Sequence, residues 1–203
     1  MLTKRTFDLI AAAVGLLVLA PLLAAIAILI KLDSRGPVLF RQVRVGLHGS
    51  TFRIHKFRTM RHAFDSLGPE LTASEDSRIT GAGRLLRRWK LDELPQLIDV
   101  VRGDMSLVGP RPEVPRYVAC YPANDVAVVL SVRPGITDFA SIRYRDESAL
   151  LSVSSDPNAD YIRKILPRKL RYYRFYVRQR SMMLDLRIIA MTLCAIAGWD
   201  RTK

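Results

Sequence analysis

The sequence has little cysteine and none of the common nucleotide-binding signatures. Only Cys120 and Cys194 occur in 203 residues, far apart and without a CxxC spacing. This usage predicts a reduced, cytosol-facing protein. No GxGxxG, Walker or GxSxG motif is present, so the enzyme classes that those motifs mark are not indicated. The length suits one domain, and we expect one catalytic unit.

Acidic residues are scarce beside basic ones, with 19 Asp and Glu against 32 Lys and Arg and a formal net charge of +13. This imbalance predicts an anionic partner: nucleic acid, a phosphorylated small molecule or an acidic lipid surface. Charge alone does not choose among them. Histidine is scarce too, and His48, His55 and His62 lack a partnering Cys or Glu pattern, which argues against a metal site there.

Charge is missing altogether from residues 9–30, a run of 22 residues. As a straight helix this run would be ~33 Å long and would match a hydrocarbon core of ~30 Å. A cleaved signal peptide is the rival interpretation, but its apolar region is usually ~7 to 15 residues long. We therefore expect the segment to lie in a bilayer rather than in a soluble core.

The flanks of this run predict its topology only in part. Lys4 and Arg5 precede it and Lys31 and Arg35 follow it, and cytoplasmic flanks are the ones that prefer basic residues. Pro21, near the middle, removes one backbone hydrogen bond and bends the helix. A re-entrant hairpin would keep both flanks inside, whereas an ordinary kinked span would not. These residues favour neither the re-entrant hairpin nor the full span over the other.

The next segments alternate polar with β-branched and aromatic residues. VLFRQVRVG and TFRIHKFRTM, separated by LHGS, predict a β-hairpin. Residues 61–80 are polar and predict a mobile surface loop. Residues 81–102 regain helical spacing, with a break or a new first turn expected near Asp92 because Pro95 cannot donate a backbone hydrogen bond.

The C-terminal third is first basic and then apolar. Eight Lys or Arg and no acid lie between Tyr161 and Arg180, interleaved with aromatic residues, a composition that suits anionic surfaces. MMLDLRIIAMTLCAIAGW follows, interrupted by Asp185 and Arg187, so an interfacial amphipathic helix fits better than a second span. A helix packed on the core explains this segment equally well.

Several short basic motifs could together surround a diphosphate. Arginine holds two phosphate oxygens with its planar fork, and a carboxylate-bound Mg²⁺ neutralises what the fork leaves exposed. In RRWKLDELPQL, Asp92 and Glu93 follow such cations directly, although acids at a helix start also offset the helix dipole. The phosphate-friendly cations are Lys56 and Arg58 in KFRTM, Arg84, Arg87 and Arg88 in GRLLRR, and Arg111 in GDMSLVGPRP.

In this order the motifs resemble those of the bacterial sugar transferases, the monotopic polyprenyl-phosphate phosphoglycosyl transferases. The resemblance covers nearly the whole chain: an apolar N-terminal segment with central Pro, KFRTM, LDELPQL, GDMSLVGPRP, VRPGIT and LDLRI. It implies the small form of the family and a re-entrant membrane helix broken at Ala20 and Pro21, with both ends in the cytoplasm. Residues 1–35 would form this helix-break-helix, and residues 36–203 a cytoplasmic catalytic domain with C-terminal interfacial helices.

The resemblance also implies a reaction. A UDP-sugar would donate a sugar phosphate to undecaprenyl phosphate and release UMP, at the cytoplasmic face of a bacterial inner membrane and in contact with membrane lipids. Asp92 would be the nucleophile that forms a covalent phosphosugar enzyme, and Glu93 would help hold Mg²⁺ or position the lipid phosphate, so that both carboxylates serve as metal ligands. Phosphate-binding positions would be Lys56, Arg58, Arg87, Arg111 and Arg145.

Three departures from the family pattern limit this transfer of roles. Ala20 stands where Ser often precedes the membrane proline, and Tyr173 stands where an acid is common in the basic helix. The segment DFASIRYRDE, expected to contact the sugar or the nucleotide, differs from that of many relatives. The donor sugar therefore cannot be inherited from the family.

Two alternatives belong to other classes of protein. A membrane-tethered nucleic-acid-binding protein would explain the charge but not LDEL, and a membrane scaffold would tolerate changes at Asp92. We expect no nucleic-acid partner. The expected fold is mixed α+β and predominantly helical, with a membrane helix, a small β-hairpin and interfacial helices.

Overall fold

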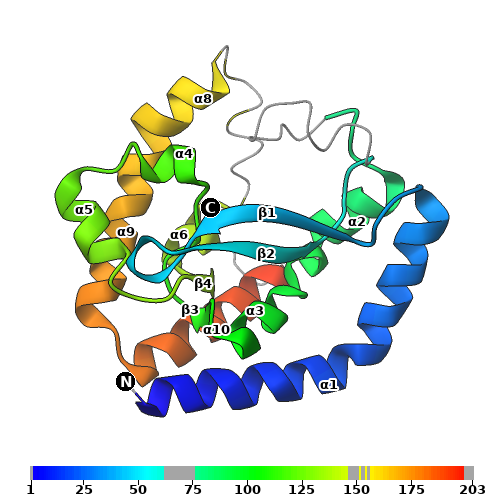
Figure 1. Cartoon of the computed structure of the whole chain (residues 1–203), viewed down its shortest axis with the longest axis horizontal. Helices are drawn as coiled ribbons and strands as arrows, with labels where there is room; N and C mark the ends of the chain where they lie inside the picture. The colour runs from blue at the N-terminus through cyan, green and yellow to red at the C-terminus, as the bar shows by residue number, and fades with distance from the viewer. Residues whose placement is uncertain (1, 62–75, 146–150, 152–153, 155, 199–203) are drawn as a thin grey trace.

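The fold is that of a computed structural model, which describes residues 2–61, 76–145, 151, 154 and 156–198. Helices dominate and two small sheets lie among them (Figure 1), which confirms the expected mixed, mostly helical class. Most of the predicted loop, residues 62–75, lies outside the described residues. The predicted division at residue 35 stays a prediction, although the first helix ends close to it.

Helix α1 (Leu2–Asp33) contains the apolar run. It is long and apolar enough to cross a membrane, and only 11% of its most apolar 18-residue window is buried against the rest of the protein. Pro21 lies inside the helix. Figure 1 shows α1 as two arms that meet at an angle, as expected where a proline removes a backbone hydrogen bond.

Polar contacts fix the first arm of α1 to the rest of the chain. Lys4 Nζ lies 2.6 Å from Asp185 Oδ2, and the Asp185 carboxylate is buried. Asp8, also buried, accepts a 2.7 Å hydrogen bond from the Ser106 hydroxyl. Arg5 donates a 2.7 Å hydrogen bond to the backbone carbonyl of Val100, in helix α3 (Gln96–Arg102). The N-terminal end of α1 is therefore held against the chain's other helices.

The other end of α1 is held as firmly. The buried Arg58 donates to the carbonyl of Ser34 at 2.7 Å and to that of Arg35, just past the helix end. Asp33 accepts a 3.1 Å hydrogen bond from the backbone N–H of Ala82, in the first turn of helix α2 (Gly81–Arg88). Both ends of the apolar helix thus contact the same body of the protein.

The predicted β-hairpin is confirmed. Strands β1 (Leu39–Val45) and β2 (Thr51–Phe57) pair antiparallel, with Gln42 opposite Ile54. The turn η1 (Leu47–Gly49) uses positive φ angles at His48 and Gly49, which close the hairpin tightly. The hairpin carries Lys56 at the end of β2.

The helical segment after residue 80 is broken, as predicted. Helix α2 (Gly81–Arg88) begins after Thr80, whose side chain accepts from the N–H of Gly83. Lys90 then adopts a left-handed conformation, the single turn η3 (Leu91–Glu93) follows, and helix α3 (Gln96–Arg102) starts after Pro95. This break leaves the two carboxylates on a short turn between two helices.

A second, parallel pair of strands was not predicted. Strand β3 (Ser106–Val108) pairs with β4 (Gly135–Thr137), which joins GDMSLVGPRP to VRPGIT. A Cβ atom on Gly135 would lie 2.0 Å from the backbone nitrogen of Gly109, so the close pairing needs glycine. Strands of three residues are too short for an alternating pattern to be recognised in the sequence. The pairing depends on the contact between the two glycines, which the sequence does not show.

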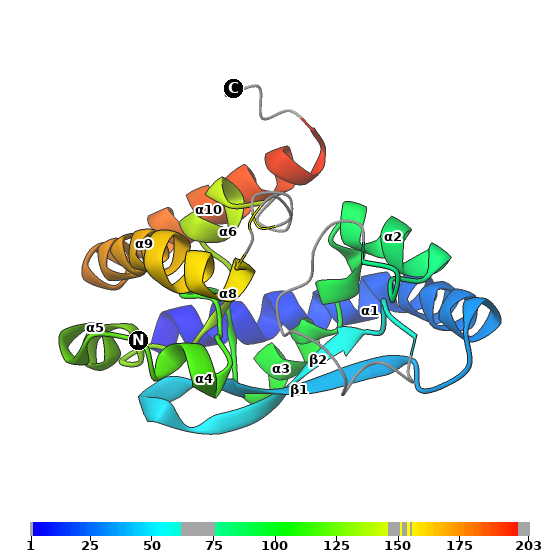
Figure 2. The ribbon, with the colours of Figure 1, turned by 90° about the horizontal axis from the view of Figure 1, so that it is seen from above.

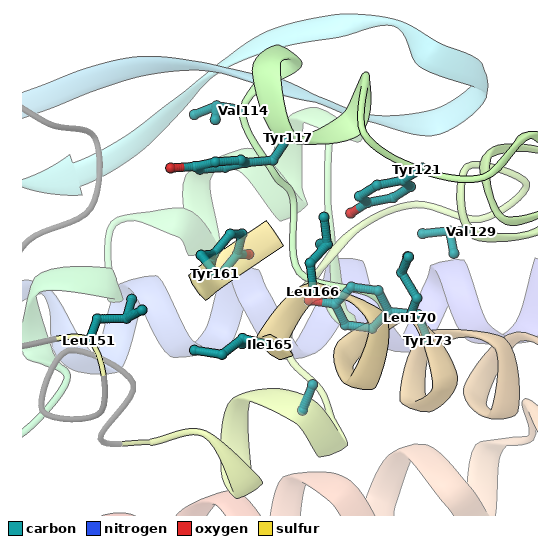
Figure 3. Packing of buried hydrophobic residues seen from close by; sticks show 11 residues of the cluster. Val114, Tyr117, Tyr121, Val129, Leu151, Tyr161, Ile165, Leu166, Leu170 and Tyr173 are labelled. Carbon is teal, nitrogen blue, oxygen red and sulfur yellow. The ribbon is translucent and has the colours of Figure 1, made fainter. Parts of the chain in front are cut away.

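The remaining helices build the main core. It consists of apolar and tyrosine side chains around Tyr161 and Leu166 (Figure 3). The helical elements are α4 (Pro115–Val118), α5 (Ala123–Val129), α6 (Phe139–Arg143), α8 (Pro157–Asp160), the π-helical turn η4 (Tyr161–Ile165), α9 (Leu166–Gln179) and α10 (Met182–Ile196). The DFASIRYRDE segment is therefore helical over α6, and its residues 146–147 lie outside the described part.

The two C-terminal helices pack on the core and also present distinctive outer faces. Helix α9 buries Leu170 and Tyr173 while most of its arginines are exposed. Helix α10 buries Asp185 and Ile188 but exposes an apolar face, on which Met183 is 76% exposed. Figure 1 shows α10 following α9 and leaving its end at an angle. Both helices therefore pack on the core. Helix α9 exposes a basic surface and helix α10 an apolar surface on the outside of the protein.

Candidate active site

The carboxylate pair sits where the backbone changes direction twice. Lys90 has φ 55° and ψ 21°, and Pro95 starts α3 without a backbone donor. Between them, the tight turn η3 directs the Asp92 and Glu93 side chains toward strand β2 and the loop after β3. Two cations from those segments, Lys56 and Arg111, meet the pair.

Asp92 is almost completely buried, with 2% of its surface exposed. Its Oδ2 lies 2.8 Å from the ammonium of Lys56. Its Oδ1 is buried and has no hydrogen-bond partner among the residues that the structure describes. A buried carboxylate oxygen without a partner is costly, and such an atom marks a place where a ligand, an ion or a reacting group belongs.

Glu93 is tied more tightly than its neighbour. Arg111 contacts both of its carboxylate oxygens, with Nη1 at 3.1 Å from Oε2, and Lys56 lies 3.3 Å from Oε1. Burial raises the pKa of Glu93, but the charges of Arg111 and Lys56 outweigh it and hold the pKa well below the usual range. Glu93 is therefore an anion that is fixed in place.

The guanidinium of Arg111 is fixed by its own surroundings. Interaction with Glu93 outweighs burial and raises the pKa of Arg111 well above its usual value. Pro110 and Pro112 flank it and restrict the backbone, and Gly109 packs on Gly135. The GPRP motif thus acts as a rigid frame for one cation.

Two further cations approach from the α2 side. Arg87 donates a 2.8 Å hydrogen bond from Nε to the Thr59 hydroxyl, which leaves its other nitrogens for a ligand. Burial lowers the pKa of Arg87, against the opposing charge of Asp92. Burial likewise lowers the pKa of Lys90, against the charge of Glu93. Desolvated cations of this kind favour an anion in the adjacent space.

A cavity of about 780 Å³ opens beside the carboxylate pair. One wall is polar and the opposite wall, from β4, α6 and α10, is largely apolar. Its size falls in the range of sites for small molecules and cofactors. The predicted site residues that line it are Lys56, Arg87, Asp92, Glu93, Arg111 and Arg145.

Arg145 reaches the cavity from the other side. Its guanidinium donates to the carbonyl of Ala195, near the end of α10, and both residues line the cavity. The two arginines Arg111 and Arg145 therefore share one cavity, while only Arg111 contacts the carboxylate pair directly. The role of Arg145 in phosphate binding stays a prediction.

Arg58 does not share this cavity. Its guanidinium is buried and occupied by the carbonyls of Ser34 and Arg35 and by the Ser34 hydroxyl at 2.9 Å. Its contacts indicate a structural role at the end of α1, and its predicted phosphate binding stays a prediction. Arg58 lies just beyond Phe57, the last residue of β2, so its side chain need not share the direction of Lys56 as it would two residues further along a continuing strand.

Sequence patterns missed a buried polar cluster at the far end of the cavity. Glu113 lies 3.6 Å from the ammonium of Lys169 and accepts a 2.5 Å hydrogen bond from Tyr161. Burial raises the pKa of Glu113, but Lys169 and Arg44 outweigh it and hold the pKa below its usual value. The cluster joins α9 and β1 to the residue that follows GPRP, a partnership that no local motif reveals.

The carboxylate pair fits Mg²⁺ only with help from a ligand. Within the described ranges no cluster of three or more His, Cys, Asp or Glu side chains could hold a metal ion. Both oxygens of Glu93 and one of Asp92 contact cations, which leaves Asp92 Oδ1 as the open donor. Mg²⁺ commonly binds through one or two carboxylates plus substrate phosphates, and this site matches that pattern.

A buried Asp92 and a partly buried Glu93 face converging cations in a chain that also carries a long apolar helix, an arrangement suited to an anionic ligand near a membrane. Comparison with known proteins agrees. The profile described as bacterial sugar transferase matches residues 1–198. The chain therefore belongs to the bacterial sugar transferase family, and the resemblance drawn from its motifs is confirmed.

Named relatives are similar over almost the whole chain. It is 42% identical over 199 residues to the undecaprenyl-phosphate glucose phosphotransferase of Komagataeibacter xylinus, covering 95% of this chain and 35% of that protein. It is 35% identical over 195 residues to the UDP-N-acetylgalactosamine-undecaprenyl-phosphate N-acetylgalactosaminephosphotransferase of Aeromonas hydrophila, covering 95% and 43%. It is 36% identical over 214 residues to the exopolysaccharide production protein PSS of Rhizobium leguminosarum bv. phaseoli, covering 95% and 94%.

The relatives differ in length and in donor. The chain spans less than half the length of the Komagataeibacter and Aeromonas proteins but nearly all of the Rhizobium protein. The first two names specify glucose and N-acetylgalactosamine, respectively. Similarity at this level thus leaves the donor sugar open.

Proposed function

We propose that this protein transfers a sugar 1-phosphate from a UDP-sugar to undecaprenyl phosphate and releases UMP. The supporting observation is Asp92: a buried carboxylate with one oxygen held by Lys56 and the other without a partner beside the cavity. The names of the relatives supply the donor and acceptor classes. The position of Asp92 supports it as the nucleophile for the chemistry between them.

In the first step, an oxygen of Asp92 attacks the sugar-bearing phosphorus of the donor. The bond from that phosphorus to the bridging oxygen breaks, and UMP leaves with the electron pair. A carboxylate needs no general base for this attack, but it must be aimed and its target must be shielded by cations. Lys56 holds Asp92 in place, and Arg87 faces the same space with nitrogens left for a phosphate.

In the second step, a phosphate oxygen of the lipid attacks the same phosphorus. The bond between phosphorus and the Asp92 oxygen breaks, which restores the carboxylate and gives a lipid diphosphate sugar. Glu93, kept ionised by Arg111, cannot compete as an acid and instead fixes the cations around the transferred group. Adjacent carboxylates thus serve two roles.

Mg²⁺ fits this scheme as a bound cofactor. Asp92 and Glu93 would hold it together with substrate phosphates, and it would supply positive charge to the diphosphate. We expect EDTA to abolish turnover and added Mg²⁺ to restore it. Full activity in excess chelator would mean that Lys56, Arg87 and Arg111 neutralise the phosphates alone.

The fold supports a monotopic protein on the cytoplasmic face of the bacterial inner membrane. Both ends of α1 contact the body that carries the cavity, so a re-entrant helix satisfies the observed contacts and a full span does not. The exposed apolar face of α10 and the basic face of α9 suit the interfacial role expected of them.

Trapping the covalent enzyme tests this function. The full chain, incubated with a panel of UDP-sugars and Mg²⁺ but no lipid, should release about one equivalent of UMP and gain the mass of one phosphosugar on the LDEL peptide, as expected for a ping-pong nucleophile. Asp92→Asn should show neither, because the amide has nearly the same shape but is a poor nucleophile. Glu93→Gln, a matched variant that keeps the nucleophile, should still form some adduct but fail to turn over.

The opposite results are equally readable. UMP that appears only when lipid is present, with no adduct, would replace the covalent step by direct transfer in a ternary complex. Near-normal turnover by Asp92→Asn would remove Asp92 from the chemistry. A wild-type chain that releases no UMP with any UDP-sugar would contradict the proposed function as a whole.

A further inference from the structure

The cavity carries more positive charge than one diphosphate requires. Of the described residues that line it, nine are Lys or Arg and three are Asp or Glu, an excess of six positive charges. The diphosphate of a nucleotide sugar carries about two negative charges at neutral pH. The surplus indicates a second anion in the same cavity.

The surplus is concentrated on one element. The acids near the cavity are already matched: Asp92 and Glu93 contact Lys56 and Arg111, and Glu113 contacts Lys169. Helix α2 and the residues just after it contribute four lining cations without an ion pair in the described part of the chain: Arg84, Arg87, Arg88 and Lys90.

Among these four, Arg84 and Arg88 differ from the other two. Arg87 and Lys90 are half-buried, and Arg87 is aligned by Thr59 beside Asp92. Arg84 and Arg88 are exposed, lie four residues apart and therefore project from one side of α2. They form an outer pair of cations at the edge of the cavity.

Helix α2 begins at the level where α1 leaves its apolar stretch. The N–H of Ala82 donates to Asp33, the last residue of α1, and Leu86 packs with Ile30. Figures 1 and 2 both show α2 beside this end of α1. If α1 lies in a bilayer, α2 lies at the depth of the lipid phosphates.

The outer surface of α2 suits that depth. Leu85 and Trp89 are 49% and 43% exposed, although both are large and apolar. The Arg88 guanidinium lies 5.7 Å from the centre of the Trp89 ring. Tryptophan and arginine side by side are typical of the membrane–water interface, where an apolar ring meets lipid and a cation meets phosphate.

We propose that Arg84 and Arg88 bind the phosphate monoester of the lipid acceptor, apart from the cations that hold the donor diphosphate. Leu85 and Trp89 would contact the adjoining lipid. This inference rests on the proposed function, because it assigns the acceptor to a place in the same cavity. It also gives the acceptor a route from the bilayer surface along α2 toward Asp92.

A binding measurement tests the assignment without turnover. The full chain in detergent micelles is titrated with undecaprenyl phosphate, and in parallel with phosphatidylglycerol at the same charge. The double variant Arg84→Gln/Arg88→Gln should raise the apparent Kd for undecaprenyl phosphate on the order of tenfold per arginine removed. Its affinity for phosphatidylglycerol should change much less. Equal loss for both lipids would overturn the proposal and make the pair a general anionic-surface contact.

A kinetic measurement separates acceptor from donor. The double variant should raise the KM for undecaprenyl phosphate and leave the lipid-free release of UMP unchanged. The matched control Arg53→Gln/Arg116→Gln removes two exposed arginines that do not line the cavity and should leave both quantities unchanged. Loss of the lipid-free UMP release in the α2 variant would overturn the proposal, because the pair would then bind the donor. If the wild-type protein releases no UMP, the proposed function is contradicted. The binding titration with undecaprenyl phosphate still tests the acceptor site in that case.

Discussion

At the scale of single residues, two adjacent acids in one turn have opposite environments. Glu93 has cations on both oxygens, whereas Asp92 has one oxygen held by Lys56 and one without a partner in the described part. The first is a fixed charge, and the second is the group that we propose as the nucleophile. The two acids share Lys56, and the asymmetry comes from Arg111, which contacts only Glu93.

The fixed charge of Glu93 should be visible in the pH dependence of stability. Its pKa is lowered in the folded state, so its ion pair stabilises the fold above the ordinary pKa and is lost only as the pH falls through the lowered value. Glu93→Gln should therefore lower the Tm at pH 7 by roughly 5–10 °C, as expected for one broken buried ion pair.

The measurement is the difference in Tm between wild type and Glu93→Gln in detergent, followed from pH 7 downward. It should stay nearly constant to pH 4.5 and shrink below that, because protonated Glu93 then resembles glutamine. A difference that disappears between pH 7 and pH 5 would show that the pKa of Glu93 is raised and not lowered.

At the scale of elements, the sequence predicts those with a strong period or a clear interruption. The apolar run, the hairpin and the break near Asp92 were predictable because composition, alternation and Pro95 act locally. The parallel β3–β4 pair was not, because three-residue strands are set by the contact of Gly109 with Gly135, far apart in sequence. The sequence predicted which Lys and Arg residues belong to the basic motifs, but it did not predict which way each side chain points.

Arg58 illustrates this limit and gives a prediction at the level of the α1–β2 junction. The buried guanidinium satisfies two carbonyls at the end of α1, so Arg58→Gln should remove both charge-assisted hydrogen bonds and cost about 2–3 kcal/mol. We expect a clear fall in Tm with little change in the KM for UDP-sugar. The control is Arg53→Gln, which removes an exposed arginine from the same strand.

The opposite pattern would restore the role that the motif alone predicted. If Arg58→Gln keeps the Tm of wild type and raises the donor KM strongly, Arg58 binds phosphate, and its contacts to α1 are incidental. Measuring both quantities on the same preparations separates the two outcomes.

At the scale of the whole molecule, α1 is held at both ends by the body that carries the site. A full span would carry its first residues about 30 Å away and would break the contacts of Lys4 with Asp185 and of Asp8 with Ser106. The buried Asp185 would lose its ammonium partner and keep only the Tyr176 hydroxyl, which is costly for a buried carboxylate. The fold itself therefore opposes the spanning topology.

This argument predicts how the topology responds to mutation. In a chain without Cys120 and Cys194, single cysteines at the exposed positions Thr3 and Pro37 should both react only with a reagent added on the cytoplasmic side. Pro21→Leu should straighten α1, yet the polar contacts should keep most molecules re-entrant. Adding Asp185→Asn to Pro21→Leu should raise the periplasmic labelling of Thr3→Cys well above that of either single change. The reason is that the contact between Lys4 and Asp185 and the bend at Pro21 oppose a full span independently. Periplasmic labelling of Thr3→Cys in the otherwise unchanged protein would establish a full span.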